Sequence, residues 1–224
     1  MKTHYTYPVD AILLLGPTGS GKTPLGDRIA SQGFLGRRSL HLDFGSVLRS
    51  ISTGLGAKAY SADEQKFIND VLERGALLEN EHFVLAEKII GLFLDRSLFR
   101  AGDVLVLNGM PRHEGQAKAV AKIASVRAVA ALVCSVESVV RRIEENTGGD
   151  RTGRVDDERA LVDRKLRIYA ERTAPLIEYY KKSGSSIYHI EVNEETTADS
   201  AYHRLTSLSA LHPPVAFVAE PPQR

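Results

Sequence analysis

The sequence predicts an α/β fold with a parallel five-stranded sheet covered by helices on both faces. Five short apolar runs have the composition of buried strands: 11–15, Leu40–Asp43, Val104–Leu107, Ala128–Val133 and Ile187–Val192. Segments with helical spacing of apolar residues lie between these runs, and strands that alternate with helices favour a parallel sheet. A glycine-rich segment directly follows the first run, at the end of a strand where such sheets bind ligands.

Composition limits the possible functions. The chain has 224 residues, 43% of them hydrophobic, which is enough for one buried core, so we expect a single domain over residues 1–224. The 29 basic and 28 acidic residues leave a net charge of +1, which argues against nucleic acid as a main partner. Cys134 is the sole cysteine, which excludes an internal disulfide and favours a reducing compartment.

Targeting signals are not evident along the chain. No apolar run reaches the roughly 20 residues that a membrane-spanning helix needs, and residues 1–10 have no apolar core of a signal peptide. We therefore expect a cytoplasmic monomer without membrane contacts. Residues 211–224 are rich in proline and predict an extended tail.

The segment after the first strand is the most informative motif. It reads Gly16-Pro17-Thr18-Gly19-Ser20-Gly21-Lys22-Thr23 and satisfies the phosphate-loop (P-loop) pattern G-x-x-x-x-G-K-[ST]. Its glycines let backbone N–H groups converge on a phosphate, and the next helix presents its positive end to the same anion. We expect the loop to bind ATP, with Lys22 at the β and γ phosphates and Thr23 on Mg²⁺. The fold is thus predicted to be of the P-loop NTPase type.

Two inserts interrupt the alternation of strands and helices. About sixty residues separate the second and third runs, too many for a structureless loop. Within them, Glu64–Leu72 and Glu79–Phe93 have apolar residues at helical spacing, which predicts a helical insert. Residues 145–153 are glycine-rich and polar, which predicts a mobile loop. Asp156-Asp157 then opens a long helix, which Pro175 ends or kinks.

A second motif follows the third strand. The segment Asn108–Gln116 resembles the D-G-F-P-R-x-x-x-Q sequence of the adenylate kinase family of nucleoside monophosphate kinases. Further segments resemble the same family in the same order: Asp43–Arg49 (S-T-G-D-M-L-R), Gly75–Leu78 (G-x-L-V), Val140–Ile143 (D-R-I), Arg154–Glu158 (R-x-D-D), and Tyr169 with Thr173–Ile177 (Y-x-x-x-T-x-P-L-I). The resemblance covers roughly residues 11 to 195.

The resemblance implies a reaction and a set of site residues. It implies ATP-dependent phosphorylation of a nucleoside monophosphate, AMP above all, with Mg²⁺, and a helical acceptor-binding insert at about 44–82 with a short lid at about 143–154. The implied catalytic residues are Lys22, Arg112, Arg142 and Arg154; those for ATP phosphates are Gly16, Gly19, Ser20, Gly21, Lys22, Thr23 and Arg142; those for the acceptor are Gly45, Arg49, Leu78, Gly109, Arg112, Gln116, Arg154 and Lys165. Gln116 is expected to read the acceptor base.

Some of these assignments have neighbours that compete for the role. Arg141, Arg151, Arg159 and Arg164 lie near the lid, and we expect some of them to be plain surface charges. Lys165 offers a point charge where the family has an arginine, so either it or Arg164 makes that contact. Asp156 and Asp157 either orient arginines across the lid or only cap the helix.

Four residues depart from the family pattern. Asn108 replaces the aspartate that holds Mg²⁺ through water, and Asp43 on the adjacent strand is the candidate replacement. Pro24 replaces a threonine whose N–H contacts the α-phosphate, which predicts weaker ATP binding because proline has no N–H. Phe44 stands where the family has a threonine near the adenine, and Asn146 replaces a lid arginine. Base specificity and rate therefore remain open.

Two alternatives to an active monophosphate kinase stay open. The departures also suit a nucleotide-binding protein of the same fold that has lost most activity and serves as a sensor. The P-loop also resembles that of enzymes that prenylate transfer RNA, so a transferase with another acceptor is the third possibility. That acceptor would call for a basic face, which the net charge of +1 does not favour.

Overall fold

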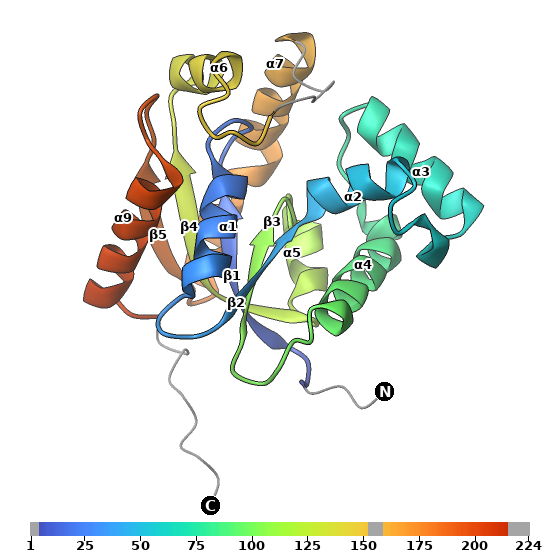
Figure 1. The fold of residues 1–224 in the computed structure, drawn as a ribbon, viewed down its shortest axis with the longest axis horizontal. Coiled ribbons are helices and arrows are strands. Elements are labelled where there is room, and N and C mark those ends of the chain that lie inside the picture. The colour runs from blue at the N-terminus through green and yellow to red at the C-terminus, as the bar shows by residue number, and fades with distance from the viewer. Residues whose placement is uncertain (1–4, 152–158, 215–224) are drawn as a thin grey trace, which may run out of the picture.

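The computed structural model describes residues 5–151 and 159–214. Within these residues a five-stranded sheet forms the centre of the molecule, in the order β2-β3-β1-β4-β5 (Figure 1). The strands are β1 (Val9–Leu15), β2 (Ser39–Asp43), β3 (Val104–Asn108), β4 (Ala124–Val133) and β5 (Ser186–Glu191). All four pairings are parallel, which confirms the predicted fold class.

Helices cover both faces of the sheet. On one face α1 (Lys22–Gln32) and α9 (Ala198–Leu211) pack on Ile12 and Leu14 of β1. On the other, α4 (Phe83–Arg96), α5 (Glu114–Val120) and α8 (Leu176–Lys182) pack on Leu13 and Leu15. Because β1 is covered on both faces, its residues 11–15 are continuously apolar and do not alternate.

Strands β1 and β4 begin two and four residues earlier than their apolar runs predict, and β2 and β5 begin one residue earlier. Val9 of β1 pairs with Ala124 of β4, and the register shifts between Ala11 and Ile12. The polar residues at this end are accommodated by ion pairs: Arg127 donates from Nε to Asp10 Oδ1 at 3.0 Å. Residues of this kind do not belong to an apolar pattern, so the sequence signal starts later than the strand.

The insert between β2 and β3 is helical, as expected. It contains α2 (Phe44–Ser52), a 3-10 turn (Ala57–Ala59), α3 (Ala62–Glu73) and a second 3-10 turn (Asn80–His82), and α2 and α3 stand to one side of the sheet (Figure 1). A capping box of Ser61 and Glu64 begins α3. The helix expected from Glu79 begins at Phe83 instead, because the 3-10 turn precedes it, and it continues to Arg96.

The remaining helices lie above the carboxyl ends of the strands. They are α6 (Val136–Glu144) and α7 (Arg159–Ile168), which continues into a π-helix (Tyr169–Thr173) before Pro175 caps α8 (Figure 1). Arg154, Asp156 and Asp157 lie outside the described residues, as does the expected tail from residue 215. The first residue of that tail, Leu211, belongs to α9.

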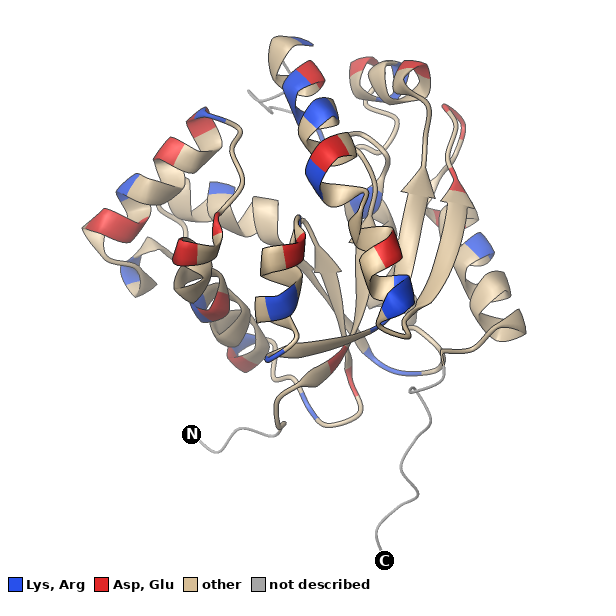
Figure 2. Ribbon diagram, turned by 180° about the vertical axis from the view of Figure 1, so that it is seen from behind, with Lys and Arg blue, Asp and Glu red and all other residues tan. Residues whose placement is uncertain are grey.

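Charge is mixed over the surface of the described residues. Figure 2 shows basic and acidic residues interspersed along the helices of the face that it displays. In the part of the chain that the structure describes, no helix has the length and apolarity that crossing a membrane requires.

Candidate functional site

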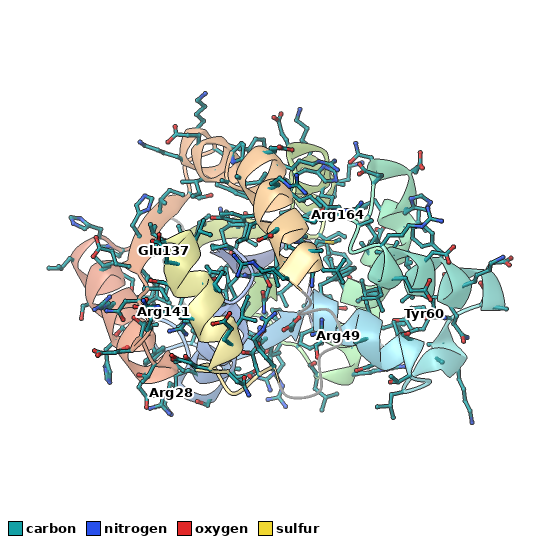
Figure 3. All side chains as sticks on the ribbon, turned by 90° about the horizontal axis from the view of Figure 1, so that it is seen from above. Arg28, Arg49, Tyr60, Glu137, Arg141 and Arg164 are labelled. Carbon is teal, nitrogen blue, oxygen red and sulfur yellow. The ribbon has the colours of Figure 1, made fainter. Side chains whose placement is uncertain are left out.

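A cleft of about 190 Å³ opens at the carboxyl ends of β1, β2 and β3. Most of the residues predicted for the site line it: Gly16, Gly19, Gly21, Lys22, Thr23, Asp43, Gly45, Arg49, Leu78, Asn108, Gly109, Arg112, Gln116 and Lys165. Ser20 and Arg142 line a smaller cavity of about 80 Å³ next to the P-loop. The sheet topology thus brings together residues from four separate sequence motifs. In the view from above, Arg49 is labelled on α2 near the middle of the molecule (Figure 3).

The P-loop has a backbone that only glycine adopts without strain. Gly19 and Gly21 have φ values of 78° and 90°, and a Cβ at Gly19 would lie 2.7 Å from Ile143 Cγ1. Gly21 is also the N-cap of α1, so the first turn of that helix faces the cleft. The Nζ of Lys22 donates to the carbonyl oxygens of Gly16 and Pro17 at 2.8 and 2.6 Å.

Positive charge is concentrated around Lys22. The pKa of Lys22 is lowered to about 7, mainly by burial and also by the charges of Arg112 and Arg151, while Asp43 and Asp150 act in the opposite sense. Burial also lowers the pKa of Arg112 to about 10. A bound polyphosphate would relieve both effects, because its negative charge favours the protonated forms. The cleft is therefore electrostatically suited to an anion.

A chain of polar side chains crosses the ends of β2 and β3. Thr23 Oγ1 donates to Asp43 Oδ2 at 2.5 Å and accepts from Asn108 Nδ2 at 3.2 Å. The same amide nitrogen lies 3.3 Å from His41 Nε2, and His41 Nδ1 lies 2.8 Å from Asp27 Oδ1. Because an amide nitrogen can only donate, His41 accepts at Nε2 and carries its proton on Nδ1.

These residues fit a magnesium ion held partly by nucleotide phosphates. Mg²⁺ prefers oxygen ligands and keeps several waters, so a hydroxyl and a nearby carboxylate suffice on the protein side. Thr23 and Asp43 supply those oxygens at the edge of the cleft. No group of three or more His, Cys, Asp or Glu residues that could hold a metal by itself occurs in residues 5–151 and 159–214.

The acceptor side of the cleft is held by contacts to backbone atoms. The N–H of Arg112 donates to Gln116 Oε1 at 2.7 Å, and its carbonyl accepts from Thr173 Oγ1 at 2.8 Å. These bonds fix the backbone from which the Arg112 guanidinium extends into the cleft. The Arg49 side chain folds back along α2 toward Gly45. A Cβ at Gly45 would lie only 3.3 Å from Arg49 Nη1.

Gln116 joins two parts of the site. Its Nε2 donates to the carbonyl oxygen of Leu78 at 2.6 Å, and the side chain is 1% exposed. The expectation that Gln116 reads the acceptor base stays a prediction, and the second amide hydrogen is the group that would serve it.

His113 was not predicted as a site residue, yet it supports the same contact. Its Nδ1 accepts from the Gln116 N–H at 3.4 Å as the N-cap of α5, and its Nε2 lies 3.2 Å from the Leu78 carbonyl oxygen. The signal in the sequence is its place three residues before Gln116, at the start of a helix.

A salt bridge links the insert to the core at the rim of the cleft. Arg172 of the π-helix donates to both carboxylate oxygens of Glu79, at 2.7 and 2.9 Å. Arg172 thereby holds the pKa of Glu79 below its usual range. Neither residue belongs to a motif, so no sequence signal pointed to the pair.

Arg142 is placed differently from the other predicted arginines. It is 3% exposed, and its guanidinium donates to the carbonyl oxygens of Gly19 at 3.2 Å, Asn193 at 2.6 Å and Thr196 at 2.9 Å. These bonds tie the P-loop to the segment after β5. Its contact with ATP stays a prediction.

Two of the departures from the family pattern also have a clear place. Pro24 lies in the first turn of α1, where its missing N–H breaks no helical hydrogen bond, and it lines the smaller cavity beside Gly148. Phe44 lines the main cleft as a buried residue at the start of α2.

The parallel sheet, the P-loop lysine and the arginines across the same cleft define a P-loop nucleotide kinase, a class of phosphotransferase. Curated relatives narrow this class. "Adenylate kinase" of Prochlorococcus marinus (strain MIT 9313) is 30% identical over 178 residues, covering 77% of this chain and 85% of the relative. "Adenylate kinase" of Parvibaculum lavamentivorans is 30% identical over 183 residues, covering 77% and 80%. The chain belongs to the adenylate kinase family.

Other comparisons bear on the fold and on the extent of the match. "Adenylate kinase" of Deinococcus radiodurans is 28% identical over 213 residues, covering 90% of this chain and 96% of the relative. The crystal structure of a gluconokinase from Sinorhizobium meliloti 1021 superposes with a TM-score of 0.52 at 15% identity, covering 96% of this chain and 100% of that one. That likeness concerns the fold alone. No protein-family model matches the chain.

Proposed function

We propose that the protein is a nucleoside monophosphate kinase that transfers the γ-phosphoryl group of ATP to AMP and yields two ADP. One observation carries the proposal: a single cleft contains the P-loop lysine, Lys22, and the two acceptor-side arginines, Arg49 and Arg112. A donor triphosphate on the P-loop and an acceptor phosphate on the arginines would then meet in one volume shielded by the insert and α7.

Phosphoryl transfer mainly requires that the two substrates are aligned and that positive charge surrounds the transferred group. An oxygen of the acceptor phosphate attacks the γ-phosphorus of ATP, a new O–P bond forms, and the bond to the β-phosphate oxygen breaks so that ADP leaves. The attacking oxygen is already deprotonated, so no general base is needed. Lys22 and Arg112 are the described residues that would stabilise the charge on the transferring group.

Mg²⁺ would neutralise charge on the β and γ phosphates when bound. For its protein ligands we propose Thr23 directly and Asp43 through water. Asn108 is less suited as a ligand, because its amide nitrogen faces both Thr23 and His41 and its side chain carries no negative charge. The carboxylate of Asp43 accepts from the Thr23 hydroxyl.

The acceptor is proposed to carry a phosphate. Arg49 and Arg112 offer planar forks that bind a dianionic phosphate in bidentate fashion, and both line the cleft. Gluconate, the substrate class in the name of the similar structure, carries only one carboxylate. We propose that the amide of Gln116, which donates to the carbonyl oxygen of Leu78, reads the edge of the acceptor base.

A second candidate function is nucleotide binding with little transfer, as in a sensor. The observations that favour it are the loss of a carboxylate at Asn108, of an N–H at Pro24 and of a lid arginine at Asn146.

The predictions of a cytoplasmic monomer that binds neither nucleic acid nor membrane also stay predictions.

A coupled assay separates these functions. The purified protein is incubated with Mg²⁺, ATP and each of AMP, GMP, CMP, UMP and gluconate, and ADP formation is followed. We expect turnover with AMP, and Lys22→Ala to lower it by about 10²-fold or more. The matched control is Lys181→Ala, which removes an exposed lysine of α8 and should retain the activity. Binding of ATP without transfer to any acceptor would refute the enzyme and leave the sensor.

A further inference from the structure

One arginine in the cleft has no place in the predicted site. Arg151 is 8% exposed and lines the main cleft, where its Nη2 donates to Thr18 Oγ1 of the P-loop at 3.4 Å. Its neighbour Arg141, labelled on α6 in Figure 3, has a side chain that is 67% exposed. The sequence does not distinguish these two arginines, but the structure places only Arg151 over the phosphate loop.

The backbone before Arg151 is folded so as to bring it there. Asn146 has a φ of 49°, a left-handed conformation that asparagine tolerates, and its Oδ1 accepts from the Arg151 N–H at 3.0 Å. The N–H of Gly149 closes the turn on the Asn146 carbonyl oxygen at 2.8 Å. A Cβ at Gly148 would lie 3.1 Å from the ring of Pro24, so the turn rests on α1.

Three cationic side chains from distant segments therefore surround one volume. Lys22 comes from the P-loop, Arg112 from the segment after β3 and Arg151 from the turn after α6. Both arginines lie close enough for their charges to act on the Lys22 ammonium. Asp43 and Asp150, which also line the cleft, act on Lys22 in the opposite sense, and a polyphosphate placed among the three cations would reduce their repulsion further.

We propose that Arg151 binds the β and γ phosphates of the donor nucleotide across the P-loop from Lys22, and that Asn146 positions it. Asn146 fixes the backbone from which the Arg151 side chain extends, because its Oδ1 accepts from the Arg151 N–H. A phosphate oxygen placed between Arg151 and the P-loop would accept a charge-assisted hydrogen bond from the guanidinium. This inference rests on the proposed function and adds a residue to its site.

The test uses Arg151→Ala, Arg151→Lys and the matched control Arg141→Ala in the full-length protein. We expect Arg151→Ala to lower kcat about 10²-fold, with Arg151→Lys in between, because lysine keeps the charge without the fork. Arg141→Ala should stay within about twofold of the unmodified protein. Asn146→Gly keeps the left-handed backbone but removes the Oδ1 contact to Arg151, so it should lower kcat with unchanged acceptor KM, as expected for a positioning residue.

Nucleotide binding provides a readout that does not depend on transfer. The Kd values of ATP and ADP are measured by calorimetry with Mg²⁺, and Arg151→Ala should weaken ATP more than ADP. If the unmodified protein binds ATP but transfers to no acceptor, the proposed function fails and the ratio of the two Kd values still decides the role of Arg151. Values of kcat and Kd for Arg151→Ala equal to those of Arg141→Ala would overturn the inference.

Discussion

Asp43 has two hydrogen-bonding tasks at the edge of the cleft. Its Oδ1 accepts from the N–H of Ser46 as the N-cap of α2, and its Oδ2 accepts from the Thr23 hydroxyl. It pairs in register with Asn108 on the neighbouring strand. A carboxylate at the end of β2 thus stands beside the position where the family has one at the end of β3.

The first prediction concerns this carboxylate. Asp43→Asn keeps a side chain that caps α2 equally well but removes the charge, so we expect the Mg²⁺ concentration for half-maximal activity to rise by about tenfold. Activity is measured as a function of Mg²⁺ at fixed ATP. Asp150→Asn, which changes a second carboxylate among the described residues of the cleft, is the comparison. If this Mg²⁺ concentration rises with Asp150→Asn and not with Asp43→Asn, the ion is bound by Asp150 instead.

The second prediction concerns the proton on Lys22. Its pKa of about 7 in the ligand-free protein lies below the usual 10.5, so between these values the lysine is neutral and must gain a proton to bind phosphate. ATP affinity should therefore fall as the pH rises above about 7. The groups that act on Lys22 are Arg112, Arg151, Asp43 and Asp150.

Calorimetry at about pH 8 in buffers of different ionisation enthalpy measures this proton uptake. The uptake should disappear in Lys22→Met. Identical heats in all buffers for the unmodified protein would show that the lysine is already charged. The same shift affects stability. Between pH 7 and 10.5 the unfolded chain keeps the Lys22 proton that the folded protein has lost, so the free energy of unfolding rises with pH through that window.

Among the elements, α1 is shaped by the strand beside it. Gly26 lies buried within this helix, where a Cβ would lie 2.3 Å from His41 Nε2 on β2. The His41 ring is only 5% exposed and is held between Asp27 and Asn108. A glycine inside a helix normally costs about 1 kcal/mol relative to alanine, and here it makes room for a side chain that orients Asn108.

The third prediction follows from this contact. Gly26→Ala should destabilise the protein by about 1–3 kcal/mol, because the overpacked His41 ring must move, despite the gain in helix propensity. Denaturant unfolding measures the free energy. In a His41→Ala background the clash is gone, so the same Gly26→Ala change should be neutral or stabilising. Equal effects in both backgrounds would show that the His41 ring is not the cause of the change in stability.

At the scale of the whole molecule, the insert and the core are joined across the cleft. The Glu79–Arg172 bridge ties the residue after Leu78 to the π-helix that continues α7. Lys165 of α7 also reaches the insert, since a Cβ at Gly75 would lie 4.0 Å from its Cε. We expect these contacts to hold the acceptor side of the cleft in place.

The fourth prediction tests the bridge. Glu79→Gln should cost less than about 1 kcal/mol of stability, because both side chains are half-exposed, but should raise the KM of the acceptor and leave that of ATP unchanged. Steady-state kinetics with each substrate varied measures this. The control is Glu114→Gln, which breaks the exposed pair with Lys118 and should alter neither KM. Equal changes in both KM values would show that the bridge acts on the whole cleft.

Much of the fold followed from local patterns. Apolar runs such as Ala128–Val133 predicted strands because a strand covered on both faces must be apolar along its length, and the predicted parallel sheet is confirmed. Element ends were less accurate, as at Phe83, because a 3-10 turn and the α-helix that follows it share one amphipathic pattern. The cleft residues were reached through motifs, because phosphate binding demands fixed spacing along the chain.

The sequence by itself determined the succession of polar and apolar segments along the chain, the P-loop and the other motifs, because periodicity and motif spacing are local properties of the chain. Only the tertiary structure decided which of the arginines from Arg141 to Arg151 enters the cleft. It placed Arg151 over Thr18 and turned Arg142 onto backbone carbonyl oxygens, although both lie in the same basic stretch. The reason is physical: the direction of a long side chain depends on the partners that packing brings near it, and those partners come from distant strands and loops.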